Sequence, residues 1–307
     1  MKTPTVNRSG SALILTLWAL LLLSTAVFAW VKFIDQEITT TYQANSGLEA
    51  RANAHSGVWV ALHPLVKKNS PLLQATFSKD HGYKVKVEGE GGKLNLTWLL
   101  QDLEQDPQKR AILDTYLYRR GLSFEERATL IDCMLDWTQP PQGNNVHRLN
   151  GAQDTDTYHN PHRPFQNLDE VAEVKGSEAL VKLPGWQDDF TLNSNGPVDL
   201  QAAPVSVLEV LPSVGDARAQ RFVQLRQGPD KIEGTDDDLL FKNVTGALSY
   251  LGFSGDAAQQ IATYVSLNDP HVRVHSVGQS GKVYRQVDVI AQKVNGGNPS
   301  IELWKEL

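Results

Sequence analysis

Ser11-Ala-Leu-Ile-Leu-Thr-Leu-Trp-Ala-Leu-Leu-Leu-Leu-Ser-Thr-Ala-Val-Phe-Ala-Trp-Val31 is a run of residues without a single charged side chain. As an α-helix rising about 1.5 Å per residue, it would extend roughly 32 Å, close to the hydrocarbon thickness of a bilayer. Lys2 and Arg8 precede the run, and no acidic residue occurs before Asp35. Because a positively charged flank stays in the cytoplasm, the sequence predicts one membrane helix, with the rest of the chain on the far side.

Three interpretations of this run remain open. The first is a plain signal anchor. The second is a cleaved secretory signal, for which Val27-Phe-Ala29 would be the cleavage site, although the run exceeds the ~7–15 apolar residues of such signals. The third depends on Gly10, which directly precedes the apolar run. A short basic leader ending in Gly resembles the signal of type IV pilins and pseudopilins, and this resemblance implies that a prepilin peptidase cuts between Gly10 and Ser11.

Leu15 departs from the usual pattern of that family. Most pilin-like proteins carry Glu at the fifth residue of the mature chain, where it is thought to pair with the terminal amine of a neighbouring subunit. A carboxylate inside a membrane is costly unless it is paired, so a subunit with nothing above it favours an apolar residue there. One pseudopilin lacks the Glu, the K-type minor pseudopilin of type II secretion systems. Leu15 is therefore interpreted as a signature of the tip position.

The periodicity beyond the membrane run predicts a helix that continues to Pro64. Apolar and small residues recur there at spacings of three and four, which is typical of one helical face: Ile34, Ile38, Thr41, Asn45, Leu48 and Ala52, strengthened near the end by Val58, Trp59 and Leu62. Tyr83-Lys-Val-Lys-Val87 alternates as a half-buried strand. The turn at 88–93 and Leu94-Asn-Leu96 predict a hairpin with a return strand.

The remaining segments predict a helical insert followed by strands. Asp106-Pro107 and Ser123-Phe-Glu-Glu126 are helix starts. Residues 204–227 resemble a helix-hairpin-helix, and 271–307 returns to strand patterns. The predicted fold class is α+β, and the resemblance to the K-type pseudopilin implies a long N-terminal helix on a small antiparallel sheet, with a large all-helical domain inserted between strands. The predicted divisions are a leader (1–10), a transmembrane half-helix (11–31), a pilin-like helix and first strands (32–97), the helical insert (98–270) and the closing strands (271–307).

A set of short motifs makes the resemblance to the K-type pseudopilin more specific. Their order and spacing are similar to those of that family: Asp136-Trp137, Arg148-Leu-Asn-Gly-Ala152, Arg163-Pro-Phe165, Leu168-Asp-Glu170, Val174-Lys-Gly176, Val198-Asp-Leu-Gln-Ala-Ala203, Val207-Leu208 and Leu211-Pro212. The resemblance covers nearly the whole chain. It implies a minor pseudopilin at the tip of a periplasmic pseudopilus, anchored in the inner membrane, with the I-type and J-type minor pseudopilins as partners.

Calcium is the candidate cofactor, because family members bind it in the helical insert. The family usually has further acidic residues after Asp-Trp, whereas Asp136-Trp137 is followed here by Thr-Gln-Pro-Pro. Calcium prefers six to eight oxygen ligands, which clustered carboxylates near glycine turns supply in part. The candidate ligands are Asp136, Asp154 and Asp156 in one region and Asp230, Asp236, Asp237 and Asp238 in another. A solvated acidic loop is the alternative for the second group.

Composition disfavours other classes of function. The net charge of −6 is unlike the basic surface of a nucleic-acid-binding protein. The alternative function is nevertheless that of a membrane-anchored DNA-binding protein of a competence apparatus, because the segment 204–227 resembles a helix-hairpin-helix.

The sequence contains no catalytic motif. The eight histidines form no zinc pattern, and no nucleophile motif or phosphate-binding glycine loop occurs. The single cysteine, Cys133, lies in an apolar helical stretch and is interpreted as a buried thiol. The sequence therefore predicts a protein that is not an enzyme.

Overall fold

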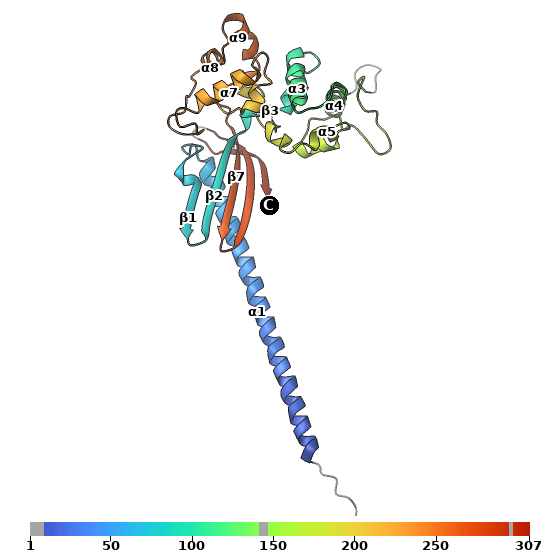
Figure 1. Ribbon diagram of the computed structural model, residues 1–307, viewed down its shortest axis with the longest axis vertical. Coiled ribbons are helices and arrows are strands. Elements are labelled where there is room, and N and C mark those ends of the chain that lie inside the picture. Colours follow the sequence, from blue (N-terminus) through green and yellow to red (C-terminus); the bar gives the residue numbers. More distant parts are fainter. Residues whose placement is uncertain (1–8, 141–146, 295–296) are drawn as a thin grey trace, which may run out of the picture.

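The computed structural model describes residues 9–140, 147–294 and 297–307. A long helix carries a five-stranded sheet near its C-terminal end, and a larger, mainly helical region lies beyond the sheet (Figure 1). In chain order the elements are α1 (Ser9–Leu62), η1 (Pro71–Leu73), β1 (Gln74–Ser78), β2 (His81–Gly89), η2 (Glu90–Gly92), β3 (Leu94–Asn95), α2 (Leu96–Gln101), α3 (Pro107–Arg119), α4 (Phe124–Thr138), η3 (Leu168–Glu173), α5 (Glu178–Val181), η4 (Trp186–Asp189), β4 (Phe190–Thr191), β5 (Val198–Asp199), α6 (Val205–Leu208), α7 (Gly215–Arg226), α8 (Val244–Tyr250), α9 (Gly255–Ala262), β6 (Val265–Ser266), β7 (His271–Ser280), β8 (Val283–Gln292) and β9 (Ser300–Glu306).

The sheet is antiparallel, with strand order β1-β2-β7-β8-β9. We call this sheet and the part of α1 that it contacts the body, and residues 90–270 the head. The head is inserted between β2 and β7, which are neighbours in the sheet and pair over the whole length of β2. The predicted α+β class is confirmed. The head also contains two short parallel pairings, β3–β4 and β5–β6, and the sequence patterns did not indicate which strands would pair.

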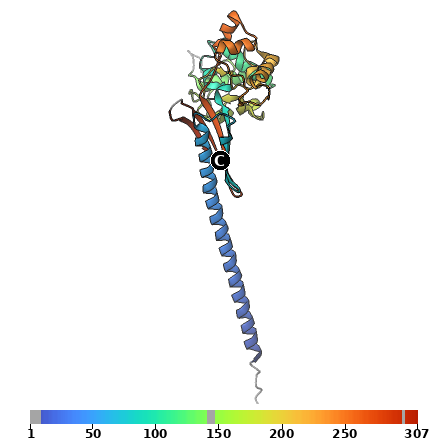
Figure 2. The ribbon, with the colours of Figure 1, turned by 90° about the vertical axis from the view of Figure 1, so that its left-hand side faces the viewer.

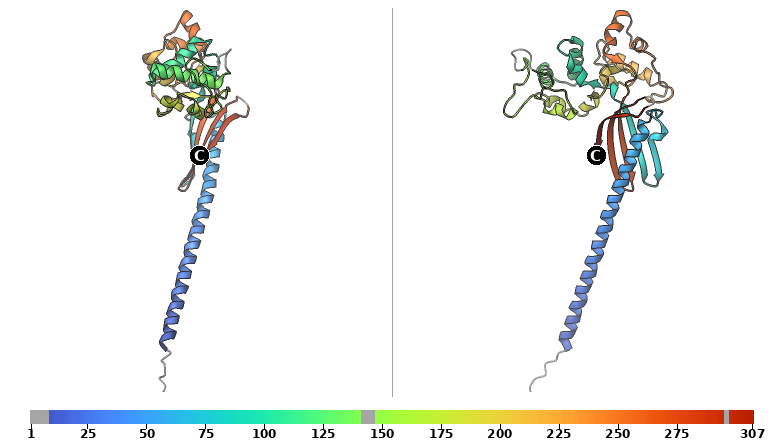
Figure 3. Two further views of the ribbon diagram at one scale, coloured as in Figure 1. Left: turned by 90° about the vertical axis from the view of Figure 1, so that its right-hand side faces the viewer. Right: turned by 180° about the vertical axis from the view of Figure 1, so that it is seen from behind.

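α1 lies against one face of the sheet (Figure 3). The residues that make this close contact are small. Ala50, Ala54 and Gly57 are buried on this side of the helix. Gly278 of β7 lies against the helix backbone, and a Cβ atom added to it would lie 2.0 Å from the Ala50 carbonyl oxygen. Larger side chains would keep the two backbones apart, so helix and strand approach closely only because both contribute small residues.

The head and the body have separate apolar cores. The body core joins α1 to the sheet, with Val58 and Leu62 packed near Val274 and Val289. The head core is larger and draws on every helix from α2 to α9. Figure 2 shows the head above the end of α1, with the lower part of the helix running free of both cores. The chain therefore consists of a helix, a small sheet and a large terminal head.

The helix boundaries follow the expected capping signals. Asp106 accepts a hydrogen bond from the Gln108 backbone N–H at 2.9 Å and is followed by Pro at the first position of α3. Ser123 and Glu126 form the predicted capping box of α4. α1 ends at Leu62, two residues before Pro64. The capping residues and the proline in the sequence therefore predicted the starts of α3 and α4 and the end of α1 correctly.

The predicted hairpin between residues 83–87 and 94–96 is wrong. β2 pairs instead with β1, which precedes it, and with β7. Leu94–Asn95 pairs in parallel with β4 inside the head. The intervening residues Glu90–Gly92 form a buried 3-10 turn that leads the chain out of the sheet. A glycine-rich turn is equally compatible with a hairpin and with an exit from the sheet, and the sequence alone favoured the wrong one.

Candidate functional site

The outer face of α1 carries an exposed stripe. We define the stripe as Ile34, Ile38, Thr41, Asn45, Leu48, Ala52 and Trp59, all of which are exposed. Ile38 is 62% exposed, Leu48 65% and Trp59 54%. Their spacing had indicated one helical face, and the structure places that face opposite the sheet rather than against it. Val58 and Leu62, which the same pattern had assigned to this face, are buried on the sheet side. The stripe is available to a partner along the helix.

The N-terminal part of α1 is apolar and exposed. It belongs to a helix that is long and apolar enough to cross a membrane, and that helix is the one such candidate in the described residues. Leu15 is 69% exposed within it. The Gly10–Ser11 bond, where cleavage was predicted, lies in the first turn of α1. The side chain of Leu15 is thus accessible to whatever surrounds the helix.

Three of the motifs quoted for the resemblance, at 136–137, 148–152 and 163–165, meet in one part of the head. The Arg148 Nη1 donates to Asp136 Oδ1 at 2.9 Å, and the Arg148 backbone N–H donates to the same carboxylate at 3.1 Å. A Cβ atom on Gly151 would lie 1.8 Å from Asp136 Oδ2, so a larger residue there would displace this carboxylate. Trp137 stacks on Phe165, with their ring centroids 6.2 Å apart. These motifs therefore hold the loop after α4 against the end of that helix.

A second carboxylate supports the same loop. Asp132 accepts hydrogen bonds from the backbone N–H of Asn150 at 3.2 Å and from its side-chain Nδ2 at 2.9 Å. Asp132 is one turn before Asp136 on α4, and both are buried. Sequence reasoning missed Asp132, although its helical spacing from Asp136 was a usable signal. Asp136, a predicted calcium ligand, is thus engaged in a buried ion pair with Arg148.

The other predicted ligands of the first region lie in the following loop. Asp154 accepts from the Asn160 backbone N–H at 3.0 Å and from its Nδ2 at 2.9 Å. The hydrogen bond from the Asn160 backbone lowers the pKa of Asp154. Asp156 is exposed. Within the described residues, no group of three or more His, Cys, Asp or Glu side chains is placed to hold a metal ion.

The four aspartates of the second region lie in one surface loop between α7 and α8. Asp237 accepts from Thr235 Oγ1 at 2.7 Å and from the Asp230 backbone N–H at 3.2 Å. The hydrogen bond from Thr235 lowers the pKa of Asp237. Asp238 Oδ2 accepts from the Gly234 N–H at 2.6 Å, whereas its Oδ1 is buried without a hydrogen-bond partner in the described part of the chain. The carboxylates stabilise the loop but do not converge on one point.

This loop is also fastened to the segment that follows α1. The Lys67 Nζ lies 2.9 Å from Asp236 Oδ1, and the Lys68 Nζ lies 3.0 Å from Glu233 Oε1. Asn69 Nδ2 donates to the Glu233 carbonyl oxygen. These contacts join residues more than 160 positions apart in the sequence, and no local pattern indicated them.

The hairpin at 204–227 contributes to the head core. α6 and α7 are joined by a turn in which Ser213 and Gly215 have positive φ. Val207, Leu208 and Phe222 are buried. Arg226, at the end of α7, is 1% exposed and donates to the carbonyl oxygens of Leu200 and Ala203. The hairpin therefore directs most of its apolar side chains, and one of its cations, into the protein, while Leu225 stays exposed.

Cys133 is buried, as predicted. Burial raises the pKa of its thiol to about 11, so it is protonated at neutral pH. A protonated, buried thiol is a poor nucleophile.

The fold is similar to that of a chain in a solved complex, "The Crystal Structure of the GspK-GspI-GspJ complex from enterotoxigenic Escherichia coli Type 2 Secretion System", with a TM-score of 0.60. The chain has a pseudopilin-like fold. The similarity covers 89% of this chain and 99% of that chain, at 11% sequence identity. No protein-family model matches the sequence, and no curated protein matches it. The pseudopilin-like fold agrees with the resemblance that the sequence motifs had indicated.

Proposed function

We propose that the chain is a K-type minor pseudopilin of a type II secretion system. It is anchored in the inner membrane by α1, its body and head lie in the periplasm, and it caps the pseudopilus tip above the I-type and J-type minor pseudopilins. The observation that carries this proposal is the exposed stripe of α1 on the side opposite the sheet, because its apolar members, among them Ile38, Leu48 and Trp59, stay open over this length and are available to partner helices. The large head lies beyond the sheet, at the opposite end of the molecule from the start of α1 (Figure 1).

The tip position is tested through Leu15. A Glu at this position would be stabilised inside the membrane only by a paired cation, such as the amine of a subunit above. We expect immunogold labelling of wild-type protein at fibre ends only, and labelling within the shaft for Leu15→Glu. Leu15→Ile, which adds no charge, is the control and should stay at the tip. Wild-type label distributed along the shaft would contradict the proposal, whatever the variant does.

Processing by prepilin peptidase is expected between Gly10 and Ser11, because the basic leader directly abuts the apolar helix. N-terminal sequencing of protein extracted from membranes should begin at Ser11. Gly10→Leu should abolish this processing and leave the leader attached. A mature chain that begins at Met1 or Trp30 in the wild type would show that the membrane run is an anchor or a secretory signal of another kind.

Calcium binding by the 228–240 loop is a separate proposal. It is supported by four aspartates in nine residues and by the buried Asp238 Oδ1 that lacks a partner. The side chains would have to turn toward one another to supply the oxygens that calcium needs, since they do not converge as placed. An ion that binds the folded state alone raises the melting temperature with its concentration.

We therefore expect the melting temperature to rise between chelator and millimolar calcium, and this rise to shrink in Asp237→Asn. Asp216→Asn, which changes an acidic residue in the first turn of α7 outside the loop, is the matched control and should retain the full rise. A melting temperature that is the same in chelator and in calcium would remove the calcium proposal without affecting the pseudopilin assignment.

A further inference from the structure

β2 has an open backbone edge over its upper half. Its pairing with β1 covers only His81 to Lys84, and the last pair is Gln74 with Lys84. Its pairing with β7, on the other side, continues to Gly89. Among the strands that the structure describes, residues 85–89 therefore have a neighbour on one side only. η1, which directly precedes β1, contacts β2 at the start of this stretch, where Leu73 and Val85 share the body core. An unpaired strand edge offers its N–H and C=O groups to another chain.

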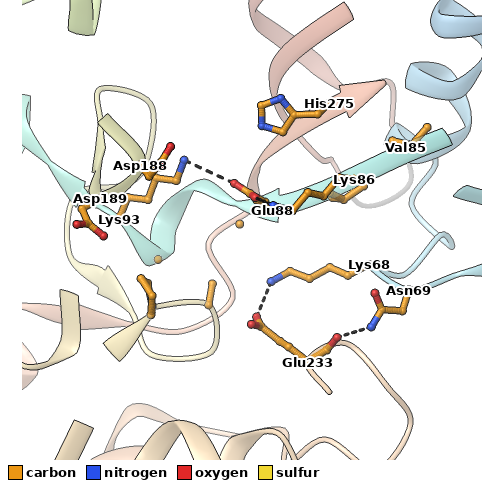
Figure 4. Close-up of a pocket in the computed structure, with 15 residues that line it drawn as sticks. Lys68, Asn69, Val85, Lys86, Glu88, Lys93, Asp188, Asp189, Glu233 and His275 are labelled. Atoms are coloured by element: carbon orange, nitrogen blue, oxygen red, sulfur yellow. Dashed lines mark hydrogen bonds and ion pairs between the residues drawn. The ribbon is translucent and has the colours of Figure 1, made fainter. Parts of the chain in front are cut away.

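This edge faces a cleft of ≈ 680 Å³ between the body and the head (Figure 4). Five consecutive residues, Val85 to Gly89, line the cleft. Side chains of a strand alternate between its two faces, so consecutive residues can line one cleft only where the backbone edge itself faces it. The volume falls within the range of about 300–1,000 Å³ that is usual for ligand sites.

The opposite wall of the cleft is formed by the segment after α1 and the acidic loop. Lys68 and Glu233 form an ion pair there, and Asn69 donates to the Glu233 carbonyl oxygen (Figure 4). The cleft closes at Gly89, where an added Cβ atom would lie 2.9 Å from the Ala202 Cβ. The accessible edge is therefore Val85 to Glu88, which at about 3.3 Å per residue is roughly 13 Å long.

The lining has charges of both signs. Lys68, Lys86 and Lys93 contribute cations, and Glu88, Asp188 and Glu233 contribute carboxylates. A nucleic acid would require a predominantly basic surface, and a lipid chain would require an apolar one. An extended polar peptide requires neither kind of surface. Its backbone can form hydrogen bonds with the open edge of β2, while its side chains pair with charges of either sign.

We propose that this cleft binds an extended, polar segment of a second polypeptide, which adds as a strand to β2 beside Val85–Glu88. The choice of partner proteins to test rests on the proposed function, whereas the open edge rests on the strand pairing alone. The bound segment would lie between β2 and the cleft wall at Lys68 and Asn69, beyond the point where η1 leads the chain away from β2. Body and head would then contact the partner together.

The edge is tested first in the full chain alone, in detergent, by amide hydrogen exchange. Alternate amides of an edge strand point away from its one neighbour. We expect at least one amide among residues 85–88 to exchange about tenfold or more faster than the amides of Val274–Val277 in β7, which has neighbours on both sides. If all four amides were as protected as those of β7, the edge would be closed within the chain and the proposal would fail.

Binding is tested with three separate probes: the soluble bodies of the I-type and J-type subunits and one protein secreted by the same system. One probe should slow exchange at residues 85–88 by about tenfold or more. Asn69 is exposed at the cleft wall, so Asn69→Trp should fill the cleft and abolish this protection, whereas Asn69→Ala should retain it.

The outcomes separate the two proposals. Protection by none of the probes, or protection that survives Asn69→Trp, would overturn strand addition. Co-purification of the I-type and J-type bodies with the chain, without any protection of β2, would overturn strand addition but leave the pseudopilin assignment standing. If neither body bound the chain but the secreted protein protected β2, strand addition would stand and the pseudopilin assignment would be overturned.

Discussion

Replacing Gly278 by alanine is expected to lower the free energy of unfolding by about 3 kcal/mol, the upper part of the usual range for overpacking a closely packed site. The added Cβ atom would lie 2.0 Å from the Ala50 carbonyl oxygen and 2.4 Å from the Ala54 nitrogen. Both are helix backbone atoms, which cannot rotate away as a flexible side chain can. Helix and sheet would have to separate, and the body core between them would lose contacts.

Gly47→Ala is the matched control, because it makes the same chemical change in α1 itself. An added Cβ atom there would meet only the end of the Arg285 side chain, at 3.6 Å. Alanine is favoured over glycine in a helix interior by roughly 0.5–1 kcal/mol, so this variant should be neutral or more stable. Urea denaturation of both variants in detergent, followed by circular dichroism, measures the difference. Equal stabilities would show that α1 and β7 do not approach as closely as described.

Glu90→Gln is expected to destabilise the junction of body and head by about 3–5 kcal/mol, as when one partner of a buried ion pair is removed. The Glu90 side chain is fully buried, with Arg273 Nε at 2.5 Å and Lys93 Nζ at 3.0 Å. Thr191 also donates to it. The variant would leave two cations without their shared carboxylate. Glu88→Gln is the control and should cost less than about 1 kcal/mol, because Glu88 is partly exposed and surface pairs contribute little.

The effect of Glu90 should also depend on pH. Burial by itself would raise the pKa of Glu90, but the nearby Arg273 and Lys93 outweigh burial and lower it. A folded-state pKa below the unfolded value of about 4.3 stabilises the protein fully above that value, and this contribution is lost as pH falls through the folded pKa. The stability gap between wild type and Glu90→Gln should therefore be constant near neutral pH and narrow in acid. A gap that widens as the pH falls would contradict this assignment.

The sequence predicted those features that depend on neighbouring residues. Hydropathy indicated α1, alternation indicated β2, and side-chain caps located the starts of α3 and α4. β1 was missed because Gln-Ala-Thr-Phe-Ser has little apolar alternation and is mostly exposed. The orientation of the stripe was also missed, since spacing defines a helical face without saying what covers it. The small residues Ala50, Ala54 and Gly57 on the opposite side carried that information.

The candidate site was less predictable than the fold. Asp136 and Arg148 were noted as parts of separate motifs, but their ion pair appears only when the loop after α4 folds back. Glu90 lies among glycines and has the pattern of a solvated turn residue. Its burial depends on Arg273, which is 183 residues away in the sequence. Single-sequence patterns extend over a few residues and carry no information on contacts at that separation.

The insertion of the head between two paired strands has a consequence for how the chain folds. If the head were unstructured, bringing β2 and β7 together would close a loop of the whole insert, at an entropic cost on the order of 4–5 kcal/mol. A folded head holds its own two ends close together, at Glu90 and at the start of β7, so the strands then meet as if joined by a short turn. The sheet should therefore assemble only after the head has folded. The rate at which the small sheet forms would then be set by the stability of a larger domain whose apolar core, among the described residues, is separate from that of the sheet.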